Sequence, residues 1–307
     1  MEESPANDGL VSVVVPTHYR NERLREAIES VRQQEYRPIE VLVVDGADDE
    51  HARPVVEEFD GVRYVHQERD EGPQAARSIG AERANGQYVQ LLDDDDRLAP
   101  EKIRKQVKLF ESAGDDSPVG VVYCGMLDES RGEILPNPAV RGDVLERALE
   151  MRTFPCITST MLIDSNVLAG MLPLGHRHGA DDTGTKIELA LRTRFDFVDE
   201  ALVYRGVTDS PLSATWSYLD GRKRVVEAYE DVYRQFPPRV RHRAVRETHF
   251  LVGRKLLAER GWSAGAVLEF ARAAYYTPEN RPYYLGECLA SAFGRPGIRV
   301  ADALFAR

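Results

Sequence analysis

A buried strand, an acidic turn and a helix start follow one another in Gln87-Tyr-Val-Gln-Leu-Leu-Asp-Asp-Asp-Asp-Arg-Leu-Ala-Pro100. Tyr88 to Leu92 is a short apolar run with aromatic and β-branched members, as is typical of a buried strand. Four carboxylates, Asp93 to Asp96, follow it directly, and Pro100 is a residue type that commonly opens a helix. In open α/β sheets, ligands bind at the carboxyl ends of the strands. We therefore expect a binding site at this acidic turn.

The acidic turn has the composition of a metal site. Four adjacent carboxylates repel one another, and a divalent cation would relieve that repulsion. Ligands that are all oxygen suit Mn²⁺ or Mg²⁺, which proteins bind with one or two carboxylates and the phosphates of a substrate. A solvated turn or a helix cap is the alternative, but these acids end a core strand. The sequence therefore predicts that a divalent cation binds here.

Length and charge limit the class of protein. The chain has 307 residues, 42% of them hydrophobic, and a formal net charge of -11. It is long enough for one large domain with an appendage, or for two domains, and it can bury a full core. Nucleic-acid binding requires a basic face, so the acidic balance argues against a nucleic-acid partner.

Several features of the sequence predict a soluble, cytoplasmic protein. No apolar run approaches the ~18 residues that are needed to cross a bilayer. Met1 to Gly9 lacks the basic start and apolar centre of a secretory signal. Cys124, Cys156 and Cys288 are scattered and odd in number, which indicates a reducing compartment, and their spacing matches no zinc site.

Strands and helices alternate four times in the first third of the chain, which predicts a parallel sheet with right-handed crossovers. The expected strands are Val11–Val15, Ile39–Val44, Val62–His66 and Tyr88–Leu92. Such an α/β layer is typical of nucleotide binding, and we interpret residues 10–117 as the half of a domain that binds a nucleotide. The regular alternation of strands and helices then ends. We interpret residues 118–210 as the half that binds the second substrate, the acceptor, so that the whole domain covers residues 1–210.

Residues 211–307 read as an all-α C-terminal region. The expected helices are Trp216–Phe236, Val240–Arg260, Ala264–Tyr275 and Glu279–Phe293. The tail from Glu287 to Arg307 mixes apolar residues with arginines, a composition that could rest on a lipid surface. Gly294, Pro296 and Gly297 interrupt it, so packing against the rest of the protein is the first expectation and peripheral membrane contact the second. The oligomeric state is left open.

Four motifs in order resemble the family 2 glycosyltransferases, which have the GT-A fold. They are Val11-Ser-Val-Val-Val-Pro-Thr17, Val43-Val-Asp-Gly46, Gly72-Pro-Gln-Ala-Ala-Arg77 and Leu91-Leu-Asp-Asp-Asp-Asp-Arg-Leu-Ala-Pro100. Each lies at the end of an expected strand, and the resemblance covers about two thirds of the chain. It implies a Rossmann-like mixed sheet flanked by helices, with the α-helical region as an appendage.

The resemblance also implies roles for residues at the strand ends. Pro16 and Thr17 would lie beside the base and ribose of a nucleotide sugar. Asp45 matches the first residue of the family's Asp-Asp-Gly-Ser motif, and Gly46 replaces the second Asp, which usually contacts uracil. This departure leaves the base open, with UDP-sugars favoured. Arg77 matches an arginine that lies near the nucleotide.

Within the acidic turn, the resemblance assigns Asp93 to the ribose and Asp95 to the metal, and Asp94 shares either role. Downstream, Ala180-Asp-Asp-Thr-Gly-Thr-Lys-Ile-Glu-Leu-Ala-Leu-Arg192 resembles the family's Glu-Asp pair at the start of a helix. Asp182 falls on the residue that usually acts as the general base, and Asp181 replaces the Glu. A helix cap is the alternative role for Asp182.

The resemblance thus implies an inverting, metal-dependent glycosyltransferase with Mn²⁺ or Mg²⁺ as cofactor. Its donor would be a nucleotide diphosphate sugar, and its acceptor a glycan or lipid-linked glycan of a cell-surface polysaccharide or protein-glycan pathway. A nucleotidyltransferase is one alternative, but the loop from Thr17 to Arg25 is not Gly-rich. A non-catalytic module that binds a nucleotide sugar or a partner is the other.

Overall fold

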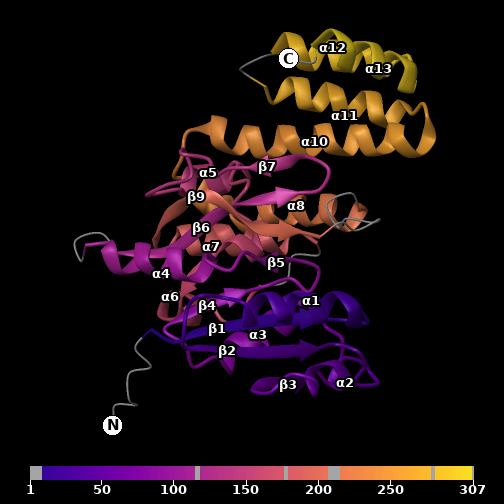
Figure 1. The fold of residues 1–307 in the computed structure, drawn as a ribbon. Coiled ribbons are helices and arrows are strands. Elements are labelled where there is room, and N and C mark those ends of the chain that lie inside the picture. The colour runs from indigo at the N-terminus through magenta and orange to yellow at the C-terminus, as the bar shows by residue number, and fades with distance from the viewer. Residues whose placement is uncertain (1–8, 115–117, 176–178, 207–214, 278–280, 306–307) are drawn as a thin grey trace. The chain divides into compact units, whose positions relative to one another are not determined.

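The computed structural model describes residues 9–114, 118–175, 179–206, 215–277 and 281–305, and the chain divides into two compact units (Figure 1). The first is an α/β unit made of Met1–Leu145, Thr153–His176 and Thr185–Asp209. The second is a helical unit made of Glu146–Arg152, Arg177–Gly184 and Ser210–Arg307.

The α/β unit contains one mixed sheet. Within the described residues its strands are β1 (Val11–Thr17), β2 (Ile39–Asp45), β3 (Val62–His66), β4 (Tyr88–Leu91), β5 (Arg97–Leu98), β6 (Val119–Asp128), β7 (Gly132–Ile134), β8 (Leu162–Asp164) and β9 (Arg194–Arg205). Their order is β3-β2-β1-β4-β8-β6-β9-β5, with β7 paired to β6. The first four are parallel, as predicted, and β8 pairs antiparallel with both β4 and β6.

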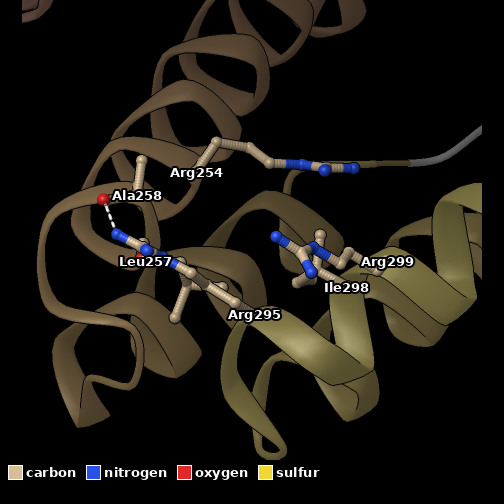
Figure 2. Close-up of a pocket in the computed structure, with 6 residues that line it drawn as sticks. All are labelled: Arg254, Leu257, Ala258, Arg295, Ile298 and Arg299. Atoms are coloured by element: carbon tan, nitrogen blue, oxygen red, sulfur yellow. Dashed lines mark hydrogen bonds between the residues drawn. The ribbon is translucent and has the colours of Figure 1, made fainter.

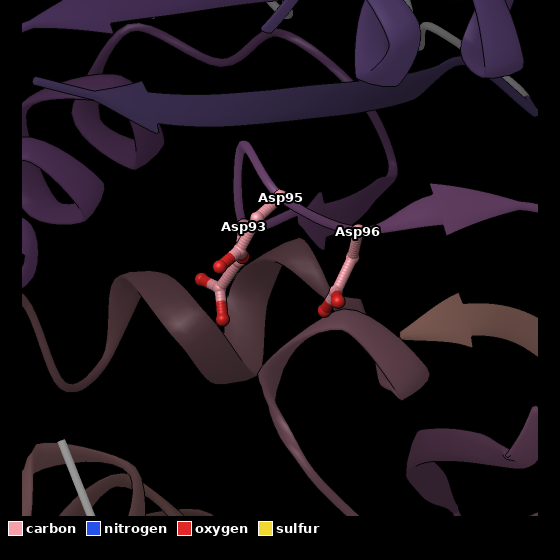
Figure 3. Close-up of side chains that lie close together, drawn as sticks. All are labelled: Asp93, Asp95 and Asp96. Atoms are coloured by element: carbon pink, nitrogen blue, oxygen red, sulfur yellow. The ribbon is translucent and has the colours of Figure 1, made fainter. Parts of the chain in front are cut away.

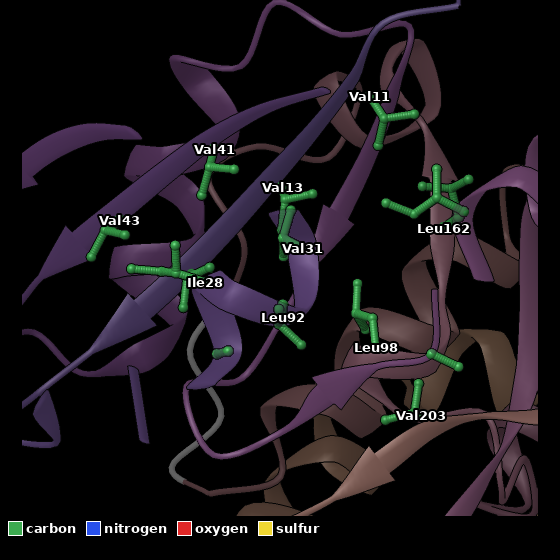
Figure 4. Close-up of a cluster of buried hydrophobic side chains, with 14 of the residues drawn as sticks. Val11, Val13, Ile28, Val31, Val41, Val43, Leu92, Leu98, Leu162 and Val203 are labelled. Atoms are coloured by element: carbon green, nitrogen blue, oxygen red, sulfur yellow. The ribbon is translucent and has the colours of Figure 1, made fainter. Parts of the chain in front are cut away.

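Helices cover both faces of this sheet. They are α1 (Asn21–Arg32), α2 (Arg53–Val56), α3 (Pro73–Glu82), α4 (Lys102–Ser112) and α6 (Ser165–Ala169). The later part of α7 (Asp181–Ala190) belongs to the same unit. Because successive side chains of a strand point to opposite faces, Val11, Val13 and Val15 share a core with α1 and α4 (Figure 4). Val14 points to the other face, where α3 packs on β1 and β2.

The helical unit contains α8 (Trp216–Ala228), α9 (Glu230–Tyr233), α10 (Pro238–Arg260), α11 (Ala264–Tyr275), α12 (Arg281–Ser291), α13 (Gly294–Phe305) and most of α5 (Leu145–Leu149). From α10 to α13, each helix packs against the next (Figure 1). Leu257, Ala266, Phe270 and Ile298 form a small core between them. None of the helices in the described ranges is both long enough and apolar enough to cross a membrane.

The structure confirms the expected mixed α/β sheet and the helices that follow it, and it differs in three details. The short strands β5 and β7 were not expected from the sequence. The expected helix Trp216–Phe236 is interrupted at Tyr229, so α8 and α9 are separate helices. The tail forms α13, because Pro296 falls in the first turn, where its missing N–H has no helical partner to lose.

Candidate active site at the carboxyl edge of the sheet

The acidic turn lies at the carboxyl end of β4, as the sequence predicts. The last bond before the turn runs from the Leu92 N–H to the Val14 carbonyl on β1, at 2.9 Å. The turn itself closes with a hydrogen bond from the Asp96 N–H to the Asp93 carbonyl, at 3.0 Å. The chain then enters β5, which pairs with β9. The carboxylates are therefore placed by strands that are well separated in the sequence.

Three of the four carboxylates lie close together. One oxygen from each of Asp93, Asp95 and Asp96 is within 4.8 Å of the others, and the three side chains point to the same side of the turn (Figure 3). Burial, together with the charge of Asp93, raises the pKa of Asp95. The same two causes raise the pKa of Asp96 to about 7. The charged forms are thus mutually destabilising, and this all-oxygen donor set fits Mn²⁺ or Mg²⁺.

Asp94 bonds to the end of β1. Its carboxylate accepts a hydrogen bond from the Thr17 hydroxyl at 2.8 Å and one from Arg20 Nη1 at 3.1 Å. Burial raises the pKa of Asp94 to about 6, and the Thr17 bond and the Arg20 charge oppose that rise. Arg20 also lies 3.4 Å from an Asp95 oxygen. Asp94 therefore fixes the turn against β1.

Arg77, on α3, is positioned beside Asp93. Its Nη2 atom lies 2.5 Å from an Asp93 oxygen, and its Nη1 atom donates to Gln74 at 3.2 Å. Gln74 in turn donates to the Thr185 hydroxyl at 2.8 Å. Only 11% of the Arg77 side chain is exposed. The structure thus places the positively charged guanidinium group of Arg77 beside the acids, where it could also bind a phosphate.

Two segments from the second half of the α/β unit support the turn: a short 3-10 helix, Thr158–Thr160, and the residue that follows β9. The Ser159 hydroxyl accepts a hydrogen bond from the Asp93 N–H at 3.1 Å, and a hydrogen bond between Ser159 and the Asp96 carboxylate lowers the Asp96 pKa. The Gly206 N–H donates to Asp96 at 3.0 Å. These contacts hold the buried Asp96 carboxylate in place.

Pro16 and Asp45 lie at the same edge of the sheet, one strand further on. Pro16 pairs with Val44, and Thr17 pairs with Asp45 between β1 and β2. The Asp45 side chain is fully buried and accepts hydrogen bonds from the Ala47 N–H, the Ala52 N–H and the Tyr64 hydroxyl. Asp45 therefore orders the loop after β2.

Asp182 lies in the first turn of α7 and belongs to the helical unit. The Thr183 hydroxyl lies 3.4 Å from its carboxylate, and Asp181 beside it is buried. Acidic residues in the first turn of a helix are favoured by the helix dipole. The start of a helix at this pair agrees with the position that the sequence implied for it.

The structure adds three residues to the site that the sequence did not assign: Arg20, Asp96 and Ser159. Asp96 carried a signal, because it is the fourth acid of the run. Arg20 also carried one, because it follows Thr17 closely at the end of β1. Ser159 carried none, since its role depends on a turn that meets the acids only in the folded chain.

The family is shown by comparison with known proteins. The model of the family described as "Glycosyl transferase family 2" matches residues 12–169, just over half of the 307 residues. An uncharacterized glycosyltransferase of Rickettsia felis is 36% identical over 36% of this chain. The succinoglycan biosynthesis protein ExoO of Rhizobium meliloti is 26% identical over 61% of this chain.

A third relative is the GalNAc(5)-diNAcBac-PP-undecaprenol beta-1,3-glucosyltransferase of Campylobacter jejuni, which is 33% identical over 29% of this chain. The chain spans only part of each relative's length: 19% of the Rickettsia protein, 53% of ExoO and 30% of the Campylobacter enzyme.

Two solved structures share the fold over nearly the whole chain. S. aureus TarS 1–349, in complex with UDP-GlcNAc, has a TM-score of 0.64 and 15% identity over 96% of this chain and 91% of its own. The mannosyltransferase PcManGT of Pyrobaculum calidifontis, in complex with GDP-Man and Mn²⁺, has a TM-score of 0.58 and 19% identity over 98% of this chain and 88% of its own. The motifs, the mixed GT-A sheet and the family match agree, and this chain belongs to glycosyl transferase family 2.

Proposed function

We propose that this chain is an inverting, metal-dependent glycosyltransferase that transfers a sugar from a nucleotide diphosphate sugar to a hydroxyl group of a glycan. The observation that carries the proposal is the cluster of Asp93, Asp95 and Asp96 at the carboxyl end of β4, with Arg77 beside it. A site of this kind suits a donor that brings a pyrophosphate and a divalent cation together. UDP-sugars are the favoured donors, and a GDP-sugar is the main competitor.

In this proposal each side chain has a distinct task. Asp95 and Asp96 bind the cation, and Asp93 contacts the ribose. When bound, Mn²⁺ or Mg²⁺ supplies Lewis-acid stabilisation of the charge that develops on the leaving nucleoside diphosphate. Arg77 adds a charge-assisted hydrogen bond to a phosphate oxygen.

Pro16 and Thr17 line the place for the base and ribose. Two aspartates maintain the shape of this place through hydrogen bonds to other groups of the protein. Asp94, bonded to Thr17, keeps the acidic turn at this place. Asp45 contributes by ordering the loop after β2.

Asp182 is the proposed general base. Its carboxylate takes the proton of the acceptor hydroxyl while the hydroxyl oxygen bonds to the anomeric carbon. The bond from that carbon to the diphosphate breaks on the opposite face, so the configuration inverts. We propose an acceptor in a cell-surface or protein-glycan pathway, including lipid-linked glycans met at the cytoplasmic face of a membrane. The names of ExoO and the Campylobacter enzyme support this class of acceptor.

The test is turnover of a panel of nucleotide sugars by the purified protein with Mn²⁺, followed as release of nucleoside diphosphate. We expect one donor class to react and Asp95→Asn to abolish the reaction. Asp182→Asn should retain donor binding and lose about 10²- to 10⁴-fold in turnover, which is the usual contribution of a general base.

Asp60→Asn, at an exposed acid in the turn before β3, is the control and should behave as wild type. No turnover of any donor by folded protein, with retained binding, would favour a non-catalytic binding module. Consumption of a nucleoside triphosphate with release of pyrophosphate would favour a nucleotidyltransferase.

A further inference from the structure

Helix α12 and the chain that follows it expose large apolar side chains. Leu285 and Leu289 are four residues apart on α12, so they lie on one face, and Phe293 continues that spacing just beyond the helix. Their exposed fractions are 48%, 72% and 77%, and that of Val300 on α13 is 61%. Amphipathic helices in a folded domain turn such side chains toward the core. We call these four residues the apolar stripe.

The charges around the apolar stripe are mainly positive. Helices α12 and α13 carry three arginines and two acids. Both acids, the fully buried Glu287 and the more exposed Asp302, pair with Arg254 on α10, at 3.0 Å and 2.6 Å. Arg281, Arg295 and Arg299 are exposed. This segment therefore shows solvent a surface that is apolar and basic, on a chain whose net charge is -11.

A pocket between α10 and α13 adjoins this surface (Figure 2). It is lined by Arg254, Leu257, Ala258, Arg295, Ile298 and Arg299, with a volume of about 460 Å³. Leu257 and Ile298 are nearly buried and give it an apolar floor. The pocket thus combines apolar surface with guanidinium groups.

The three guanidinium groups of the pocket differ in their partners. Arg254 is neutralised by Asp302 at 2.6 Å and by Glu287. Arg295 donates to the carbonyl groups of Leu257 and Ala258 at the end of α10. In the part of the chain that the structure describes, no acid pairs with Arg299. Its charge is therefore available to an anion that enters the pocket.

We propose that α12 and α13 bind the surface of a bilayer that contains anionic lipids. The apolar stripe enters the boundary between headgroups and acyl chains, and Arg281, Arg295 and Arg299 attract the negative surface. Arg299 pairs with one lipid phosphate at the pocket. The proposal rests on the proposed function for its purpose, because a transferase that extends a lipid-linked glycan must meet that glycan at the membrane.

A second copy of the chain is a less suitable occupant. In a symmetric dimer the same surface faces itself. The arginines around the apolar stripe would then approach the arginines of the other copy, and like charges across an interface are unfavourable. An anionic bilayer satisfies the apolar side chains and the charges together.

The test is co-sedimentation of the full chain with vesicles, without nucleotide or acceptor. Vesicles of phosphatidylcholine alone are compared with vesicles that also contain phosphatidylglycerol. We expect binding to the anionic vesicles. Added salt should weaken this binding, because salt screens the attraction between exposed arginines and the anionic lipid surface. Absence of binding, or equal binding to both kinds of vesicle, would overturn the proposal. Because no donor is present, this result is independent of whether the protein proves to be a transferase.

Two variants locate the surface. Arg299→Glu should lower partitioning onto anionic vesicles by roughly tenfold, since one attractive charge becomes repulsive. Leu289→Gln combined with Phe293→Gln should lower it at least as much, because the insertion of two apolar side chains is lost. Arg224→Glu, at an exposed arginine of α8, and Leu135→Gln, at an apolar side chain that is 48% exposed, should bind as wild type does.

The thermal midpoints of all four proteins check that each is folded. Light scattering of the wild type tests whether a second copy of the chain covers the apolar stripe. A dimer that the Leu289→Gln and Phe293→Gln pair dissociates would assign the apolar stripe to a protein interface and contradict the lipid proposal.

Discussion

The Thr17 hydroxyl joins the ends of β1 and β4. It donates to an Asp94 oxygen at 2.8 Å, and only 7% of the Asp94 side chain is exposed. Thr17→Val keeps the shape of the side chain and removes this donor. Hydrogen bonds to charged groups contribute about 1.5–3 kcal/mol, so we expect the free energy of unfolding in urea to fall by about that amount.

Thr193→Val provides the matched control for Thr17→Val. The Thr193 hydroxyl lies 3.4 Å from the Pro118 carbonyl and is exposed, so its loss should change the free energy of unfolding by less than about 1 kcal/mol. Equal stability of Thr17→Val and wild type would contradict the role of Asp94 in fixing the acidic turn.

The acidic turn itself could be predicted from a run of four aspartates after an apolar strand. The partner of each carboxylate could not. Asp94 pairs with Arg20, which is 74 positions away in the sequence, and Asp93 bonds to Ser159, which is 66 positions away. Such pairs depend on which strand ends meet at one edge of the sheet. No local pattern in the sequence carries that information.

At the scale of elements, α4 buries a lysine in the core of the α/β unit. The Lys102 side chain has no exposed surface and donates to the side-chain carbonyls of Gln90 and Gln106. Burial lowers the pKa of Lys102 from 10.5 to about 8. In the window between these values the unfolded chain binds more protons than the folded chain, so this group makes stability rise with pH.

The expected result is a pH-dependent difference between wild type and Lys102→Met, which cannot titrate at this position. As the pH rises from about 8 to about 10.5, the free energy of unfolding of the wild type should gain up to about 3 kcal/mol relative to the variant. Urea unfolding of both proteins across this window measures it. A constant difference would show that Lys102 titrates as it does in water.

Gly80 on α3 permits the helix to approach the sheet. A Cβ atom at this position would lie 2.2 Å from Val14 Cγ1 and 3.1 Å from Val44 Cγ2. We expect Gly80→Ala to lower the free energy of unfolding by about 1–3 kcal/mol, because overpacking outweighs the better helix propensity of alanine. Gly114→Ala, where nothing lies near the added atom, should leave stability nearly unchanged. Similar stability of both variants would contradict this packing.

The long elements of the fold could be predicted, and the short ones could not. Val11–Thr17 and Ile39–Asp45 are continuous apolar strands, and the structure contains both nearly as expected. The strands β5 and β7 have two and three residues, which is too few to show a period. Their pairing with β9 and β6 is a property of the sheet and not of their own sequence.

At the scale of the whole molecule, the α/β layer and the later helices follow the order that the sequence predicts. Two short segments, Glu146–Arg152 and Arg177–Gly184, are exceptions, because they belong to the helical unit although they lie within the α/β sequence. Glu146 pairs with Arg239 at 2.8 Å, and the nearly buried Glu150 pairs with Arg243 at 2.6 Å. Each pair spans 93 positions of the chain, so the sequence offered no local sign of it.

The central claim is that the acidic turn binds a nucleotide together with a divalent cation. The most direct test is the thermal midpoint of the wild type and of Asp95→Ala with UDP, GDP and dTDP, each with and without Mn²⁺. A ligand that binds only the folded chain raises the midpoint by mass action. We predict a rise with one nucleotide class that requires Mn²⁺, is lost in Asp95→Ala and is retained in Asp60→Ala. A rise that is independent of Mn²⁺ and equal in Asp95→Ala, or no rise in folded protein, would contradict the claim.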